Sequence, residues 1–331
     1  MKLKHCFGLL LAMLIVTACS TEDSTSETPP TSEKYTVSLA LGGEISVTDE
    51  PLARGTATNH IYGINVYYDK DGDGETNDLY GYGLFDNIED MTIELLSNHK
   101  YKFECSLVKN GKTSLYFNSG YLAPFQSGSY ASSYSKTILG NKFIIGSGNY
   151  LTGIKSGNAH LNNTTYTNSS SSTKYASVNR FYGELDNYTP IQGGVATIYL
   201  KRVVFGAKFI ITGVEDGTLN VSSPFWSKGL TEDYESDEMI FTFNDVYDCW
   251  KNETRWGATI SLTFTSDRGN ANNLSNSQTI TFKRNTLTTV IINVNPMTGF
   301  TFTTEDWGED NLIDLEINTD GVIDTPVVPT E

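Results

Sequence analysis

The stretch TISLTF, residues Thr259–Phe264, places Ile, Leu and Phe on one side of an extended chain and Thr or Ser on the other. Such alternation is typical of a strand with one buried face. The stretches Tyr35–Leu41 and Met91–Leu95 alternate in the same way, whereas helix-period stretches are nearly absent. Because many short strands separated by turn residues favour antiparallel sheets packed face to face, the sequence predicts an all-β protein of antiparallel β-sandwiches.

A hairpin is predicted between two neighbouring stretches. Asn110-Gly111 separates Tyr101–Val108 from Thr113–Phe117. Both residues of a tight hairpin turn need a positive φ, which Asn and Gly adopt at little cost. We therefore expect these two stretches to pair with each other.

The chain begins like a bacterial secretion signal. Lys2 and Lys4 precede an apolar run from Phe7 to Val16 that is too short to span a bilayer stably. The run leads through Thr and Ala to Cys19, and this sequence resembles the lipobox of bacterial lipoproteins, in which the cysteine thiol is acylated. The alternative is an ordinary signal peptide with a cysteine near its cleavage site by chance.

Cleavage before Cys19 would remove residues 1–18 and leave this cysteine as a lipid-bearing N-terminus, with palmitate among its acyl chains. Residues 19–33 are rich in Ser, Thr, Glu and Pro, cannot bury enough surface to order, and are predicted to be a disordered tether. Glu22-Asp23 is similar to the export signal that sends some lipoproteins of Bacteroides-type bacteria to the cell surface. We therefore expect an outer-membrane, lipid-anchored protein at the cell surface, and a periplasmic location is the alternative.

The remaining length suits two domains of ordinary size. The N-terminal β-sandwich domain is predicted at residues 34–189, with a long polar loop region between Ser119 and Tyr175 in which only Lys142–Ile145 resembles a strand. Thr189–Gly194 marks the boundary because an apolar strand pattern restarts after it.

The C-terminal β-sandwich domain is predicted at residues 190–318, and residues 319–331 are expected to form a loose tail. Its predicted strands are Val195–Leu200, Val203–Thr212, Met239–Phe243, Thr259–Phe264, Gln278–Phe282 and Thr289–Val294.

The composition is acidic. The formal charge is −16, and loss of Lys2 and Lys4 with the signal lowers it by two, to −18. This balance argues against nucleic acid and anionic lipid as partners. After Cys19, the remaining cysteines are Cys105 and Cys249. Cys105 alternates with apolar residues and is predicted to be a buried, inert thiol, although an oxidising compartment would also allow a disulfide to Cys249.

The sequence DKDGDGETND, Asp69–Asp78, matches the first half of a calcium loop, with carboxylates at alternate positions followed by glycine. Tyr80 stands where such a loop carries its bidentate glutamate. The loop also joins predicted strands instead of helices. Calcium is the expected ion, if any binds, and the alternative is a solvated Asp/Gly turn. The candidate ligands are Asp69, Asp71, Asp73, Glu75 and Asp78.

Several segments together resemble the fimbrillin-like proteins of Bacteroides-type bacteria, which are lipoproteins that include fimbrial shaft, anchor and tip subunits. The order and spacing of the segments carry the resemblance, since each alone is weak. They are the lipobox at Cys19, Pro51–Arg54, Ile61–Tyr67, Lys201–Lys208, Lys283–Asn285 ahead of Thr289–Val294, and Glu305–Trp307.

The resemblance implies two tandem transthyretin-like β-sandwich domains in a non-catalytic subunit or accessory of a fimbrial or adhesive assembly. In fimbrial members, a trypsin-like protease cuts after an arginine and removes the first strand. This exposes a groove that accepts a strand from the next subunit. Arg54 is the candidate cleavage residue here, and a loop arginine that is never cut is the alternative. Tyr35–Leu41 would be displaced, and Leu312–Ile317 or a neighbouring stretch could be the donor. Other fimbrial subunits, or adhesion targets, are the implied partners.

Two other functions compete with this one. A glycan-binding surface lipoprotein could use some of the 19 tyrosines and four tryptophans, among which Trp226 is the tryptophan expected to be exposed. An enzyme is not expected. His60, His99 and His160 lie outside any nucleophile elbow or zinc-type pair.

Overall fold

The structure is a computed structural model of the chain. It describes residues 33–45, 59–118, 121–125, 135–136, 139–157, 175–253, 255–268, 273–295 and 299–307. The predicted signal at 1–18, Cys19, nearly all of the tether, Arg54, His160 and the tail lie outside the described residues.

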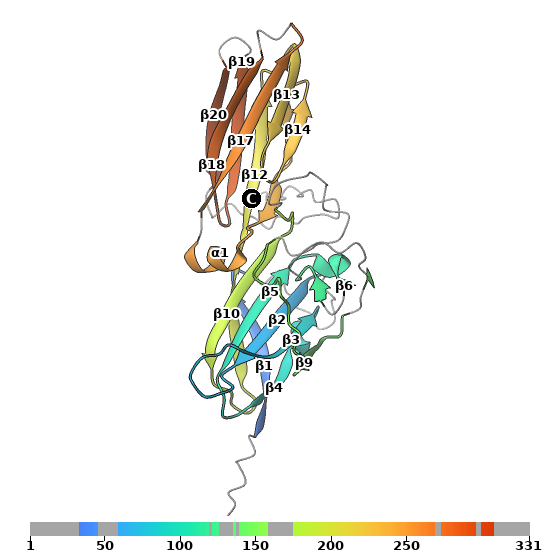
Figure 1. Cartoon of the computed structure of the whole chain (residues 1–331), viewed down its shortest axis with the longest axis vertical. Helices are drawn as coiled ribbons and strands as arrows, with labels where there is room; N and C mark the ends of the chain where they lie inside the picture. The colour runs from blue at the N-terminus through green and yellow to red at the C-terminus, as the bar shows by residue number, and fades with distance from the viewer. Residues whose placement is uncertain are drawn as a thin grey trace, which may run out of the picture. The chain divides into compact units, whose positions relative to one another are not determined.

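The first sheet has eight strands. They are β1 (Lys34–Gly43), β2 (Ile61–Tyr68), β3 (Asp78–Phe85), β4 (Thr92–Leu96), β5 (Tyr101–Val108), β9 (Lys142–Ile145), β10 (Arg180–Tyr188) and β11 (Val195–Arg202). Their order is β4-β1-β11-β10-β5-β2-β3-β9 (Figure 1). β11 pairs with β10 only through Phe181 and Tyr182, so the sheet can fold over at this point.

Folding over turns the sheet into a sandwich with one core. Val37 of β1 and Ile93 of β4 lie in the same buried cluster as Ile64 of β2 and Phe103 of β5. In β4 and the first half of β1, buried and exposed residues alternate, as expected for strands with one solvent-exposed face.

The other face of β2 is covered by the segment between β5 and β10. Asn65 accepts a hydrogen bond from the amide of Leu151 at 2.9 Å and donates one to its carbonyl at 3.1 Å. Gly63 allows Phe125 and Leu151 to approach, because an added Cβ would lie 2.9 Å from each. The same segment holds the 3-10 helix η3 (Gly111–Ser114) and the small sheet of β6 (Tyr116–Asn118), β7 (Tyr121–Ala123) and β8 (Ser135–Lys136).

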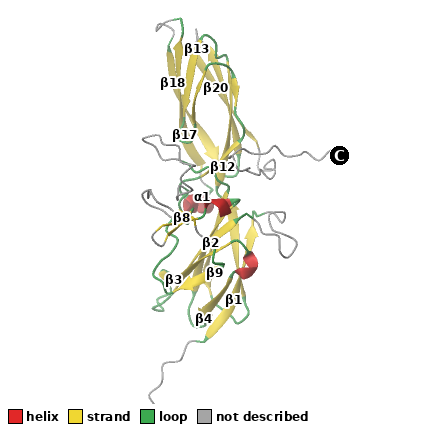
Figure 2. Cartoon of the chain, turned by 90° about the vertical axis from the view of Figure 1, so that its right-hand side faces the viewer, coloured by secondary structure: helices red, strands yellow, loops and turns green. Residues whose placement is uncertain are grey.

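The rest of the chain forms two further sheets. One contains β12 (Val204–Thr212), β15 (Tyr234–Glu235), β16 (Met239–Thr242), β19 (Leu287–Asn295) and β20 (Gly299–Trp307). The other contains β13 (Gly217–Ser222), β14 (Ser227–Leu230), β17 (Arg255–Ser266) and β18 (Leu274–Lys283). Strands make up most of this part of the chain (Figure 2).

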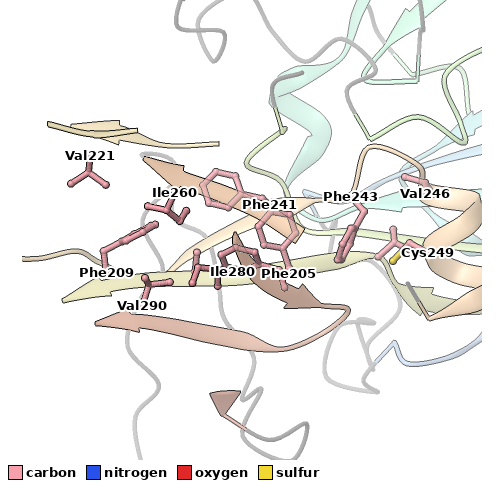
Figure 3. Close-up of a cluster of buried hydrophobic side chains, with 14 of the residues drawn as sticks. Phe205, Phe209, Val221, Phe241, Phe243, Val246, Cys249, Ile260, Ile280 and Val290 are labelled. Carbon is pink, nitrogen blue, oxygen red and sulfur yellow. The ribbon is translucent and has the colours of Figure 1, made fainter. Parts of the chain in front are cut away.

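The core between these two sheets is aromatic in its centre. Phe205 of β12 is fully buried, and its ring lies 5.1 Å from the ring of Phe243 (Figure 3). The ring of Phe282 lies at the same distance from Phe205. Ile260 of β17 and Val290 of β19 are buried in the same cluster. The all-β prediction is thus confirmed, with buried cores enclosed between sheets.

Short helices complete the described chain. The α-helix α1 (Val246–Asn252) begins after Asp245, whose side chain accepts a hydrogen bond from the amide of Asp248, and η2 (Ile88–Asp90) precedes β4. No helix among the described residues combines the length and apolar character needed to cross a bilayer.

The structure differs from the sequence analysis in how strands pair. Two pairings are parallel, β1 with β11 and β12 with β19. They were not predicted, because alternation of apolar residues does not encode strand direction. The hairpin predicted at Asn110-Gly111 is wrong: β5 pairs with β2 and β10, while only Asn110 has a positive φ and Gly111 starts η3.

The predicted boundary at residue 190 also differs from the change of sheet. β11 follows residue 190 but hydrogen-bonds in the first sheet, so the chain changes sheet at Val203. The polar turn before β11 is a connection between two strands of one sheet. The described residues from Glu33 onward belong to one compact unit.

Both described cysteines are free and buried. Cys105 is fully buried, as predicted, and burial raises the pKa of its thiol. Burial also raises the pKa of the Cys249 thiol, to about 12. Both thiols are therefore protonated and unreactive at neutral pH.

Replacing the central aromatic residue of the second core should destabilise the protein strongly. We expect Phe205→Ala to lower the free energy of unfolding by about 3–5 kcal/mol, because it leaves a cavity among packed rings. Thr263→Ala, at an exposed position of β17, is the control and should change it by less than about 1 kcal/mol. Urea denaturation measures both, and equal effects would contradict this account of the core.

Candidate functional site

The strand expected to be displaced, β1, lies between β4 and β11. Its first half, Lys34–Ser38, pairs antiparallel with β4. Its second half, Ser38–Gly43, pairs parallel with β11. The amide of Leu39 also donates to the carbonyl of Met91 at 2.8 Å. β1 therefore uses both of its edges, as a strand inserted into a slot does.

The side chains of β1 that face the core fill that slot. Val37 is fully buried and Leu39 is 4% exposed. Both belong to the cluster that contains Ile93 of β4 and Ile198 of β11. Burial of an aliphatic side chain of this size stabilises by about 1.5–3 kcal/mol. β1 thus contributes apolar burial as well as a hydrogen-bond ladder to the first sandwich.

The end of β1 requires glycine. Gly43 has a φ of +98°, and a Cβ at this position would lie 2.3 Å from the carbonyl oxygen of Leu200. The next residue, Glu44, donates its amide hydrogen to the same carbonyl at 2.9 Å. The backbone therefore leaves the sheet through a glycine turn that is fixed against β11.

The acidic loop between β2 and β3 is organised by its own hydrogen bonds. Asp69 is 7% exposed, and its Oδ2 accepts a hydrogen bond from the amide of Gly74 at 3.0 Å. Asp73 accepts one from the amide of Glu75 at 2.8 Å. The Nδ1 of His99 donates to the Asp69 carbonyl at 2.7 Å. The Asp73 bond reaches the amide two residues along the chain and is that of an Asx turn.

The predicted ligands of this loop are not gathered around one point. Asp71, Asp73 and Glu75 are exposed, and Asp78 is half-buried. In the part of the chain that the structure describes, no group of three or more His, Cys, Asp or Glu side chains is placed to hold a metal ion. The buried Oδ1 of Asp69 has no hydrogen-bond partner. Calcium binding stays a prediction.

A cluster of charges that was not predicted from the sequence is centred on two buried carboxylates, one on β5 and one on β10. Lys155 contacts Glu104 at 2.6 Å and Glu184 at 3.0 Å, and Lys102 contacts Glu184 at 3.0 Å. Tyr182 donates a hydrogen bond to Glu184. Both carboxylates are nearly buried, so their role is to hold Lys155, and with it the segment that covers β2.

The charges of this cluster shift its pKa values. Burial alone would raise the pKa of Glu184, but the hydrogen bonds from Tyr182, Lys155 and Lys102 outweigh burial and hold it below its usual range. Burial lowers the pKa of Lys155, but Glu104 and Glu184 raise it above its usual range. Glu184 and Lys155 are therefore both ionised at neutral pH.

The described histidines hydrogen-bond to backbone groups of loops. His60 Nδ1 accepts a hydrogen bond from the amide of Asn110, and His99 holds the acidic loop as described above. These contacts account for both imidazoles as structural groups.

Aromatic side chains that could serve a glycan site are mostly packed. Trp226 was expected to be exposed but is half-buried. Its ring stacks on Phe209 at 4.5 Å and on Tyr234 at 6.1 Å. Tyr175 lies 4.3 Å from Trp256 in the second core. Among the tyrosines of the polar loop region, Tyr150 keeps 41% of its surface exposed. Stacking on Phe209 and Tyr234 leaves Trp226 a poor platform for a sugar ring.

Comparison with known proteins yields no matching family model and no matching curated protein. Similar solved structures include a protein of Bacteroides eggerthii provisionally assigned to cell adhesion (TM-score 0.39, 11% identity, 83% of this chain and 96% of that one). They also include the fimbrial anchor protein Mfa2 (0.35, 9%, 83% and 98%) and the tip fimbrial protein Mfa3 (0.31, 11%, 83% and 100%), both of Porphyromonas gingivalis. At TM-scores below 0.5, these similarities do not say what this chain binds.

Calcium should stiffen the acidic loop if its carboxylates can close on an ion. We expect millimolar calcium to raise the melting temperature of the protein, and Asp71→Ala combined with Asp73→Ala to abolish the rise. Differential scanning calorimetry with magnesium as the control measures this. No shift in the parent protein would exclude the calcium site.

The ion cluster should make the protein sensitive to acid. Because the folded-state pKa of Glu184 is lowered, its contribution is present above the ordinary value of 4.5 and is lost as the pH falls through the folded-state value. We expect Glu184→Gln to lower the free energy of unfolding at pH 7 by about 2 kcal/mol or more, and to flatten its fall below pH 4.5.

The control for this prediction is Glu94→Gln. Glu94 pairs with Lys34 at 3.5 Å, and both side chains are 61% exposed, so the loss should be below about 1 kcal/mol. Urea denaturation at a series of pH values compares the two variants. An identical pH profile for Glu184→Gln and the parent would contradict the assignment.

Proposed function

We propose that this chain is a non-catalytic, lipid-anchored surface protein that takes part in a fimbrial or adhesive assembly by exchanging its first strand. The observation that carries the proposal is the place of β1, which lies between β4 and β11 and hydrogen-bonds with both. The fimbrillin-like sequence motifs support the same function. The partners would be other subunits of the assembly.

Removal of β1 would create a binding site for an extended peptide. The unpaired edges of β4 and β11 would present backbone N–H and C=O groups, and Ile93 and Ile198 would lose the side chains that cover them. Exposed strand edges recruit another strand, with backbone hydrogen bonds providing affinity and alternate side chains providing selectivity. The segment Leu312–Ile317 of another copy is our candidate donor.

The position of Arg54 relative to the anchor gives cleavage a second effect. Cys19 and β1 both lie on the N-terminal side of Arg54, whereas the other strands that the structure describes lie on its C-terminal side. A cut after Arg54 would leave the lipid covalently joined to β1 alone. The folded remainder would then be held to the membrane only through the contacts of β1, until another strand takes its place.

Brief trypsin treatment of the full chain without its lipid tests the proposal. We expect selective cutting after Arg54, seen by mass spectrometry, followed by growth into larger species on size exclusion. Arg54→Gln is the matched control and should stay intact and monomeric. A chain that is cut after Arg54 yet stays monomeric at high concentration would contradict strand exchange between copies.

A further inference from the structure

The residue that follows β1 carries a carboxylate held by distant parts of the chain. The Oε2 of Glu44 accepts a hydrogen bond from the backbone amide of Arg202 at 2.8 Å and another from Nη1 of Arg284 at 2.7 Å. The same Nη1 donates to the carbonyl of Arg202 at 3.1 Å. These three residues therefore form a small closed network at the end of the strand.

Arg284 depends on this carboxylate. Its side chain is only 9% exposed, and its Nε has no hydrogen-bond partner. Among the described residues, the other carboxylate near it is Glu253, at 3.7 Å, and that side chain is 63% exposed and also pairs with Lys201 at 3.2 Å. A guanidinium so far removed from water is costly without a close acceptor.

We infer that Arg284 and the amide of Arg202 form a carboxylate-binding site that selects the strand lying beside β11. A strand that replaces β1 must bring an Asp or Glu to the position of Glu44. This inference rests on the proposed strand exchange and specifies the partner further. The site sets the register of the incoming strand, because a slip of one residue would move its carboxylate away from Arg284 and its apolar side chains out of the core.

The C-terminal tail of a second copy fits this requirement. In β1, the buried residues Val37 and Leu39 precede Glu44 by seven and five positions. In the tail, Ile313 and Leu315 precede Asp320 by the same seven and five positions. The segment Ile313–Asp320 is therefore the occupant to which the inference commits.

One position of the tail fits less well. Thr319 would take the place of Gly43, where a Cβ would meet the carbonyl oxygen of Leu200. A threonine also adopts positive φ at a cost. We therefore expect the tail to bind more weakly than β1 itself, and Thr319→Gly to strengthen its binding.

Labelled peptides test the inference on the complete chain cut after Arg54. The peptides are residues 33–45 and 312–321, each with and without its carboxylate at the critical position (Glu44→Gln and Asp320→Asn). Fluorescence anisotropy should show binding weakened about tenfold or more in both neutral variants, as expected when hydrogen bonds to a charged group are lost. Asp314→Asn is the matched control, because Asp314 takes the place of the exposed Ser38 and should not change the affinity.

The protein side is tested with Arg284→Gln. In a chain cut after Arg54 and carrying this substitution, the Asp320→Asn peptide should bind as well as the parent peptide. The peptide variants are measured on the unsubstituted chain, so the test does not depend on the folding of the Arg284→Gln chain.

The outcomes separate the inference from the proposed function. Equal binding of the acidic and neutral peptides would overturn the carboxylate-binding site and leave strand exchange standing. Binding of the 33–45 peptide without any binding of the 312–321 peptide would overturn the tail as occupant. Failure of every peptide to bind would overturn strand exchange, and with it the inference.

Discussion

The backbone of β1 hydrogen-bonds first to β4 and then to β11, and β4 is otherwise the last strand of its sheet. β4 is therefore joined to the rest of the first sandwich by the ladder of β1. Val37 and Leu39 add apolar burial to the same strand. A protein that loses β1 loses a shared edge and part of a core together, and only another strand restores both.

The end of β1 also connects the first sandwich with the strands that follow it. Glu44 is bound by Arg202, the last residue of β11, and by Arg284, which directly follows β18. The chain changes sheet next to this point, where the amide of Val203 donates to the carbonyl of Arg180 at 2.9 Å. Occupancy of the β1 slot is therefore coupled to the joint between the two sandwiches through a charged pair.

Alternation predicted strands well where one face is buried along the whole strand, as in β17, where buried and exposed residues follow each other strictly. It could not predict partners, so β5 was paired with the wrong neighbour. It missed α1, which is too short to show a helical period. Glu44 carries no local signal, because the residue that makes it significant, Arg284, stands 240 positions away.

The direction of β1 has a consequence for the geometry of an assembly. The slot is parallel to β11 on one side and antiparallel to β4 on the other, so a strand entering backwards would reverse both ladders. If copies exchange strands as proposed, every subunit that fills the slot would therefore point the same way. Such head-to-tail contacts do not pair two identical surfaces as a twofold dimer does, so repeated addition would yield a ring or a filament with two different ends.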